Sequence, residues 1–109
     1  MKTSIITLLM IGTSITMLAN GQELYKKCTG CHGEDGKTSA LQKSAIIAAQ
    51  ESNLTIKQLT AYKNGELNQY GLGNIMKLQL TTITDVEIEE LANYIASMQK
   101  DENNKNFSE

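Results

Sequence analysis

The residues able to do chemistry in this chain are concentrated in one pentapeptide, Cys28-Thr29-Gly30-Cys31-His32. It holds both cysteines and the only histidine of the 109 residues. The spacing Cys-x-x-Cys-His is typical of covalent haem attachment. Two thiols three residues apart can both reach the vinyl groups of one porphyrin, and the adjacent imidazole can then bind the iron. We therefore predict one covalent haem c, with Cys28 and Cys31 as thioether residues and His32 as the proximal axial ligand.

Three other chemistries of a Cys-x-x-Cys motif fit the chain less well. A thioredoxin-like redox motif belongs to a βαβ unit, and no strand pattern is present. A structural zinc ion takes four ligands, whereas the two cysteines and the histidine supply three. A disulfide between residues three apart would close a loop too small to stabilise the fold much.

The second axial position of the iron cannot be filled by another histidine of this chain. Methionine, lysine, a small molecule or an open position remain, and a thioether suits low-spin iron. Met1, Met10 and Met17 fall in an N-terminal segment that we expect to be removed, and Met98 lies on the apolar stripe of a C-terminal helix. Met76, in a glycine-rich stretch, is therefore the leading candidate for the distal axial ligand.

Residues 1–20 have the pattern of a secretory signal. Lys2 gives the positive start, a weakly apolar stretch follows, and Ala19 can precede the cleaved bond. No apolar run reaches the roughly 18 residues that span a bilayer. We expect cleavage, a periplasmic protein without stable membrane insertion, one domain over residues 21–99, and a polar tail over residues 100–109.

Four segments carry the spacing or the end signals of helices, namely residues 21–27, 41–50, 55–64 and 84–99. The third has Ile56, Leu59 and Tyr62 on one face and Gly65 after its end. The last is the strongest, because Thr84 and Glu87 fit a capping box and apolar residues recur behind them at helical spacing. Residues 29–38 and 66–80 are rich in glycine and predict loops. The prediction is a small all-α fold of three to five short helices with long loops, in which a buried haem enlarges the core.

The charge of the chain is modest and uneven. Ten lysines, no arginine and 12 acidic residues give a net charge of -2, which argues against a nucleic-acid partner. Residues 24–78 hold seven lysines against four acids, whereas residues 79–109 hold two lysines against seven acids. Four lysines stand close in sequence to the haem motif or to Met76, and we expect them to form a basic rim: Lys26, Lys27, Lys43 and Lys77.

A longer pattern runs from Gly21 to about Met98. Its elements are Gly21-x-x-Leu24-Tyr25 before the cysteines, Gly33 after them, then Tyr62-Lys63-x-Gly65, Met76 and Leu91-x-x-Tyr94-Ile95. The pattern resembles that of class I c-type cytochromes, of the small soluble monohaem periplasmic kind. The resemblance implies first and last helices that cross, with Gly21 and Leu24 facing Leu91 and Tyr94. It also implies His32 and Met76 as the axial pair.

Two departures from that family pattern concern the haem surroundings. Many members have a proline whose carbonyl accepts from the proximal imidazole, but this chain has no proline. We therefore expect a carbonyl within residues 43–45 to orient His32. Because arginine is also absent, the haem propionates need other partners, for which Tyr62 and Tyr70 are candidates.

Iron held by His32 and Met76 has no open position, which predicts an electron carrier and not an enzyme. The resemblance suggests a cytochrome bc complex as the donor and a haem-copper oxidase or cytochrome c peroxidase as the acceptor. We expect a monomer. The alternative is a haem protein with an open sixth position that binds a diatomic ligand or peroxide.

Overall fold

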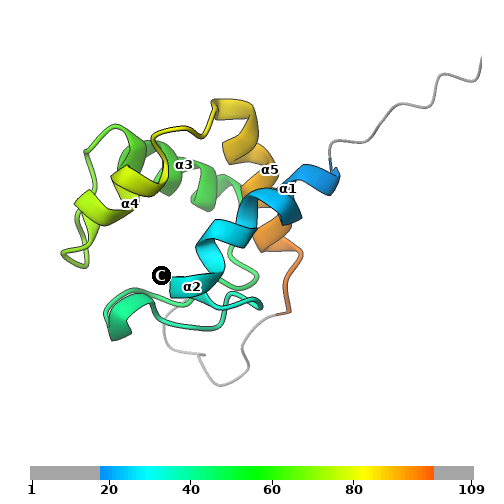
Figure 1. The fold of residues 1–109 in the computed structure, drawn as a ribbon, viewed down its shortest axis with the longest axis horizontal. Coiled ribbons are helices and arrows are strands. Elements are labelled where there is room, and N and C mark those ends of the chain that lie inside the picture. Colours follow the sequence, from blue (N-terminus) through cyan, green and yellow to red (C-terminus); the bar gives the residue numbers. More distant parts are fainter. Residues whose placement is uncertain (1–17, 100–109) are drawn as a thin grey trace, which may run out of the picture.

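The computed structural model describes residues 18–99, and the remaining parts of the predicted signal segment and tail lie outside the described residues. This part of the chain is helical and contains no strand, which confirms the all-α prediction (Figure 1). In chain order the elements are α1 (Leu18–Tyr25), η1 (Lys26–Cys28), α2 (Thr29–His32), η2 (Ala40–Gln42), α3 (Ser52–Lys63), α4 (Gly73–Gln79) and α5 (Asp85–Ala96). The η elements are single turns of 3-10 helix.

The first and last helices, α1 and α5, cross in contact, as the family resemblance implies (Figure 1). Their close approach depends on Gly21. A Cβ atom at this position would lie 2.5 Å from the Glu90 carbonyl oxygen and 2.8 Å from the Tyr94 Cβ. Beside the crossing, the rings of Tyr25 and Tyr94 pack with their centroids 5.4 Å apart. The crossing therefore joins the cysteine motif, which follows α1, directly to the main core helix.

Helix α5 begins where its sequence predicts. The Thr84 side chain accepts a hydrogen bond from the Glu87 N–H (3.2 Å), and the Glu87 carboxylate accepts one from the Thr84 N–H (3.0 Å). Both bonds of the capping box are thus present. The inner face of the helix buries Ile88, Leu91 and Ile95, and the helix ends three residues before the predicted end.

Helix α3 starts three residues earlier than predicted, at Ser52, and packs against both α5 and α4. It ends near Gly65, which takes the left-handed conformation (φ +75°) that favours glycine after a helix. The Gly65 N–H donates to the Tyr62 carbonyl (3.0 Å). Glycine therefore ends this helix as its position in the sequence indicates.

The short helix predicted over residues 41–50 is wrong: only the irregular single turn η2 forms there, and it ends at Gln42. Leu41, Gln42 and Ala49 have positive φ angles of 50°, 60° and 62°, which interrupt a right-handed helix. The N–H groups of Ile47 and Ala48 instead donate to the Gly36 carbonyl. Ala49 donates to the carbonyl of Ile95 in α5 (3.0 Å). Bonds to distant segments thus replace the helical ones.

The two predicted loops are each partly helical, so those predictions are also wrong in part. Residues 29–32 form α2, and Met76 lies inside α4 and not in a loop. The Gly73 N–H donates to the Asn68 side-chain oxygen (2.8 Å), and a Cβ at Gly73 would collide with the Leu67 carbonyl oxygen. Gly73 therefore permits a close approach at the start of a helix, whereas the sequence suggested a flexible stretch.

Candidate haem site

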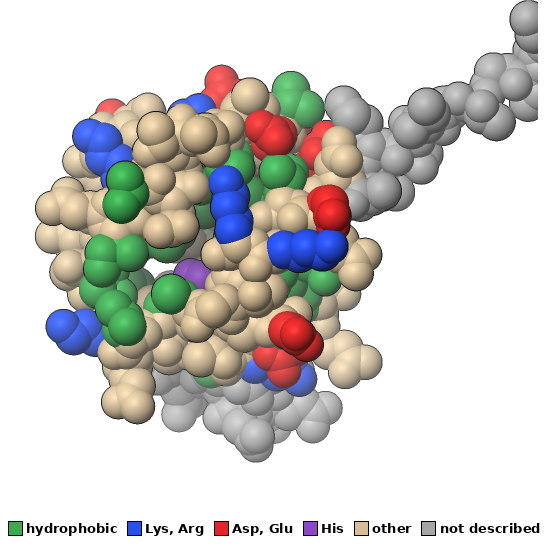
Figure 2. All heavy atoms as spheres, in the orientation of Figure 1, with side chains coloured by type: hydrophobic (Ala, Val, Ile, Leu, Met, Phe, Trp, Pro, Cys, Tyr) green, Lys and Arg blue, Asp and Glu red, His purple; other side chains and the backbone are tan. Residues whose placement is uncertain are grey.

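A pocket opens between two walls of the fold and is lined mainly by apolar side chains. One wall consists of the cysteine motif, η2 and the segment after it, and the other consists of α3 and α4. Core side chains such as Leu91 and Ile95 also line the pocket. Figure 2 shows this pocket as a hollow with the histidine inside it and hydrophobic side chains around it. A hollow of this character suits a large, flat and mostly apolar group.

The three chemical groups of the pentapeptide meet at this pocket. Cys28, Cys31 and His32 all line it, because η1 and α2 wind the motif into consecutive helical turns. Both cysteines are free thiols, Cys31 exposed and Cys28 half-buried. Burial raises the pKa of the Cys28 thiol, and the neighbouring Lys27 opposes that rise. Two accessible thiols and an imidazole at one apolar hollow are the donor set that covalent haem binding requires.

His32 is the last residue of α2 and is 8% exposed. Burial lowers the pKa of its imidazole, which favours the neutral form that binds metals. The Thr38 N–H donates to the His32 carbonyl (3.1 Å) and ties the following loop to the helix end. Within residues 18–99, no three His, Cys, Asp or Glu side chains are placed so that they could together hold a metal ion.

The expected carbonyl partner of His32 is absent from the described part of the chain. The Nδ1 atom of His32 is buried and has no hydrogen-bond partner there, so the prediction of an acceptor within residues 43–45 is wrong. The local serines explain this result. The Ser39 hydroxyl donates to the Ser44 carbonyl, and the Ser44 hydroxyl donates to the Ala45 carbonyl (3.2 Å). Two of the three candidate carbonyls are thus already engaged within their own loop.

The two methionines of the described residues occupy different surroundings. Met76 projects from α4, is half-buried and lines the pocket. Met98 is also half-buried, and both methionines pack against the core, but Met98 does not line the pocket. Its sulfur lies 2.6 Å from where a Cβ of Gly36 would be. The fold therefore brings Met76 to the same pocket as His32 and leaves Met98 elsewhere.

Tyr25 supports the site in a way that sequence reasoning missed. Its side chain is 2% exposed, and its hydroxyl donates to the carbonyl of Gly33, the residue after His32 (2.6 Å). Burial raises the pKa of Tyr25 to about 12. The phenol therefore holds the chain directly behind the histidine. Two residues separate Tyr25 from Cys28 in the sequence, but only the fold shows that its hydroxyl reaches Gly33.

Polar side chains on α3 and just before it were missed as well. Gln50, Thr55 and Gln58 line the pocket and are joined by hydrogen bonds. Tyr62 and Tyr70, expected near the propionates, also line it. Burial and the proximity of Tyr70 raise the pKa of Tyr62. These residues form no contiguous motif, although the spacing of 55, 58 and 62 places three of them on one helix face.

Comparison with known proteins agrees with this geometry. Residues 18–99 match the cytochrome c family. The chain is 31% identical over 99 residues to cytochrome c-553 of Nitratidesulfovibrio vulgaris (strain DSM 19637 / Miyazaki F), covering 87% of this chain and 92% of that protein.

Two longer proteins are also similar. The CcoP subunit of a cbb3-type cytochrome c oxidase from Helicobacter pylori (strain 52) is 30% identical over 89 residues, covering 75% of this chain and 28% of that subunit. Cytochrome c4 of Stutzerimonas stutzeri is 31% identical over 71 residues, covering 65% of this chain and 34% of that protein. The haem-binding pentapeptide lies at an apolar pocket, the first and last helices cross, and the family match covers most of the chain. The chain therefore belongs to the cytochrome c family, electron carriers that hold haem c covalently.

Proposed function

We propose that this cytochrome c is a mobile one-electron carrier of a periplasmic respiratory chain, with the haem iron held between His32 and Met76. One observation carries the proposal: among residues 18–99, these are the only histidine and the only methionine that line the pocket. A bound haem supplies a one-electron iron couple. Because a ligand on each side leaves no open position for a substrate, electron transfer is the role that this arrangement supports.

The protein's own contribution is a mainly apolar pocket whose walls are held by contacts between helices. Leu59 of α3 and Leu80 after α4 line the pocket, and Leu80 is 4% exposed. Helix α4, which carries Met76, packs against α3, which in turn packs against α5. This chain of contacts keeps the thioether in place while the charge of the iron changes. The side chains around the iron then need to move little when an electron is gained or lost.

Replacing Met76 tests the ligand directly. In the haem-loaded Met76→Ala variant we expect loss of the far-red sulfur-to-iron band and rapid binding of carbon monoxide to the reduced form. Met98→Ala is the matched control and should retain the band, because Met98 lies outside the pocket. A band that survives in Met76→Ala would show that another group fills the position. A wild type that is already high-spin and binds carbon monoxide would favour the alternative haem protein with an open site.

Lysines near the pocket support weak docking to acidic redox partners. Lys27 lines the pocket, and Lys43 and Lys77 are exposed. Figure 2 shows lysine side chains around the hollow on this face. Lys26 belongs less to such a rim, because its ammonium pairs with Glu23 at 2.6 Å. Opposite charges on a partner would increase the association rate more than the affinity.

Partner classes that fit are a cytochrome bc complex as donor and a haem-copper oxidase or cytochrome c peroxidase as acceptor. The similarity to an oxidase subunit from Helicobacter pylori supports the choice of an oxidase. The periplasmic location rests on the signal pattern of residues 1–20. Within the described helices, none is both long enough and apolar enough to cross a bilayer.

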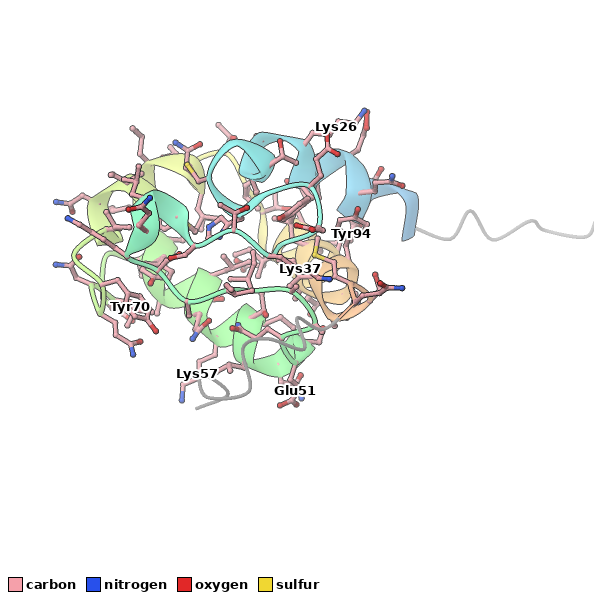
Figure 3. The ribbon with its side chains drawn as sticks, turned by 90° about the horizontal axis from the view of Figure 1, so that it is seen from below. Lys26, Lys37, Glu51, Lys57, Tyr70 and Tyr94 are labelled. Atoms are coloured by element: carbon pink, nitrogen blue, oxygen red, sulfur yellow. The ribbon has the colours of Figure 1, made fainter. Side chains whose placement is uncertain are left out.

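Ionic strength tests the basic rim without a known partner. The rate of oxidation by hexacyanoferrate, an anion, should fall severalfold between about 0.01 and 0.2 M salt, because screening shortens the reach of the lysine charges. Replacing Lys27, Lys43 and Lys77 by Gln should flatten this dependence. Lys57→Gln, on α3 at the far side from Lys26 in Figure 3, should leave it steep. A rate that is independent of salt in the wild type would contradict the rim.

A further inference from the structure

A hydrogen-bonded group of polar side chains lines the apolar pocket on the side of α3. The Gln50 amide nitrogen donates to the Thr55 hydroxyl oxygen at 2.9 Å and to the Gln58 side-chain oxygen at 2.7 Å. We call these three residues the amide network. Thr55 is 4% exposed, and both glutamines are half-buried. Polar groups at an apolar cavity carry a desolvation cost unless they form hydrogen bonds, either with each other or with a group bound in the cavity.

The donors of the amide network exceed its acceptors. Both N–H bonds of the Gln50 amide are engaged within the network. The Thr55 hydroxyl hydrogen and the two N–H bonds of Gln58 have no acceptor within residues 18–99. The free group that suits such a surplus of neutral donors is one that only accepts hydrogen bonds, and an ionised carboxylate is the common example.

The haem carries two such carboxylates, its propionates, and the chain offers them few cations. There is no arginine, and Lys27 is the one lysine of residues 18–99 that lines the pocket. Lys27 directly precedes Cys28, on the side where the vinyl groups attach, whereas the propionates belong to the opposite half of the macrocycle. In Figure 3, Glu51, just before α3, and Lys57, in its middle, lie on the side of the molecule opposite Lys26, which precedes the motif.

We propose that Gln50, Thr55 and Gln58 form the binding subsite for one haem propionate, which accepts hydrogen bonds from the Thr55 hydroxyl and the Gln58 amide. Gln50 is a positioning residue that orients both through its own amide. The inference rests on the covalent haem of the proposed function but not on ligation by Met76. Donors to a carboxylate stabilise its charged form, so the subsite keeps that propionate ionised where no cation is near.

The test follows the propionates themselves in the reduced, haem-loaded protein. Haem labelled with ¹³C at both carboxyl carbons allows each carboxylate to be titrated by NMR. In Thr55→Val and in Gln58→Met, which keep the side-chain volume, one of the two carboxyl pKa values should rise by about one unit, a tenfold change in its dissociation constant. Thr60→Val is the matched control, because Thr60 lies on the exposed face of α3 and should move neither value.

The outcomes distinguish a propionate subsite from a role of the amide network at the second axial ligand. Unchanged carboxyl titrations in both folded variants would overturn the proposal. A shifted sulfur-to-iron band with unchanged titrations would assign the network to the second axial ligand and would overturn it as well. If wild type lacks the sulfur-to-iron band, the axial pair of the proposed function fails, yet the titrations still decide the subsite. The reduction potential should change its pH dependence in Gln58→Met and not in Thr60→Val.

Discussion

At the scale of single residues, the haem-binding histidine is held by its backbone more than by its ring. The Nδ1 atom of His32 has no partner in the described structure, whereas its carbonyl accepts from Thr38 and the next carbonyl accepts from Tyr25. The buried phenol of Tyr25 also packs on Tyr94 of α5. A hydroxyl placed by the core thus orders the turn that follows His32.

Tyr25→Phe should lower the free energy of unfolding by about 1 kcal/mol, because the hydrogen bond to Gly33 is lost. It should also change the dependence of stability on pH. The pKa of Tyr25 is raised to about 12 in the folded chain, against about 10 when unfolded. The unfolded chain therefore loses this proton first, and the wild type loses stability between about pH 10 and 12, by at most about 1.4 kcal/mol per pH unit.

Denaturant unfolding of both haem-loaded proteins at several pH values from 8 to about 11.5 measures this effect, since titration of the lysines is common to both. The stability advantage of the wild type over Tyr25→Phe should shrink above about pH 10 and reverse before about pH 11.5. Tyr94→Phe is the control, because the Tyr94 hydroxyl makes no hydrogen bond within residues 18–99. A difference that stays constant up to pH 11.5 would contradict a buried Tyr25 hydroxyl.

At the scale of elements, the helices differ in what determines them. Helix α5 carries its own start signal and its own apolar face, so local and tertiary preferences agree. Helix α4 has neither a side-chain cap nor a strong pattern. It forms because Gly73 fits closely against Leu67 and because α3 covers one side of it. The helix that carries Met76 therefore depends strongly on its neighbours.

Thr84→Ala should destabilise the haem-loaded protein by about 1 kcal/mol, because it removes the side-chain acceptor at the start of α5. Thermal or denaturant unfolding measures the loss, and Thr82→Ala, exposed and outside any helix, should be close to neutral. The bonds to Thr84 hold the pKa of Glu87 below its ordinary value. The contribution of Glu87 is therefore present at neutral pH and is lost as the pH falls through the acid range. Equal losses in both variants would show that the cap does not stabilise this helix.

At the scale of the whole molecule, the core and the haem pocket are largely the same set of side chains. Among the described residues, eight hydrophobic side chains are buried, and six of them also line the pocket: Tyr25, Ala40, Leu80, Ile83, Leu91 and Ile95. His32 and Thr55, the buried polar residues of this part of the chain, line the pocket too. A chain of this size has little other apolar surface to bury. The cofactor is thus part of the core and not only a ligand of it.

Chain produced without haem attachment should therefore lose most of its cooperative thermal transition. The physical reason is that an empty pocket leaves a large unfilled cavity beside the core side chains and removes the group that binds only the folded state. Circular dichroism and calorimetry of haem-free and haem-loaded protein measure the difference. A haem-free chain that unfolds cooperatively near the temperature of the loaded form would show that the helices have a sufficient core of their own.

The amino-acid sequence by itself determined the features that depend on neighbouring residues. Covalent attachment of a haem needs two thiols and an imidazole within five positions, and the pentapeptide contains all three groups. The capping box of α5 and the glycine end of α3 are likewise decided within a few residues. The all-helical class and the close approach at Gly21 followed from spacing and from the family pattern.

Only the tertiary structure decided the features that join distant segments. Glycines suggested a loop around Met76, whereas packing on α3 makes it a helix. Residues 41–50 looked helical, but their N–H groups found partners in Gly36 and α5. The hydrogen bonds from serines to the carbonyls of residues 44 and 45, and those within the amide network, were likewise visible only in the folded chain. The helix propensities of ordinary residues differ by only a fraction of a kcal/mol per residue, whereas burying an apolar side chain against a distant segment contributes more. Packing therefore decides whether such a segment becomes a helix or a loop.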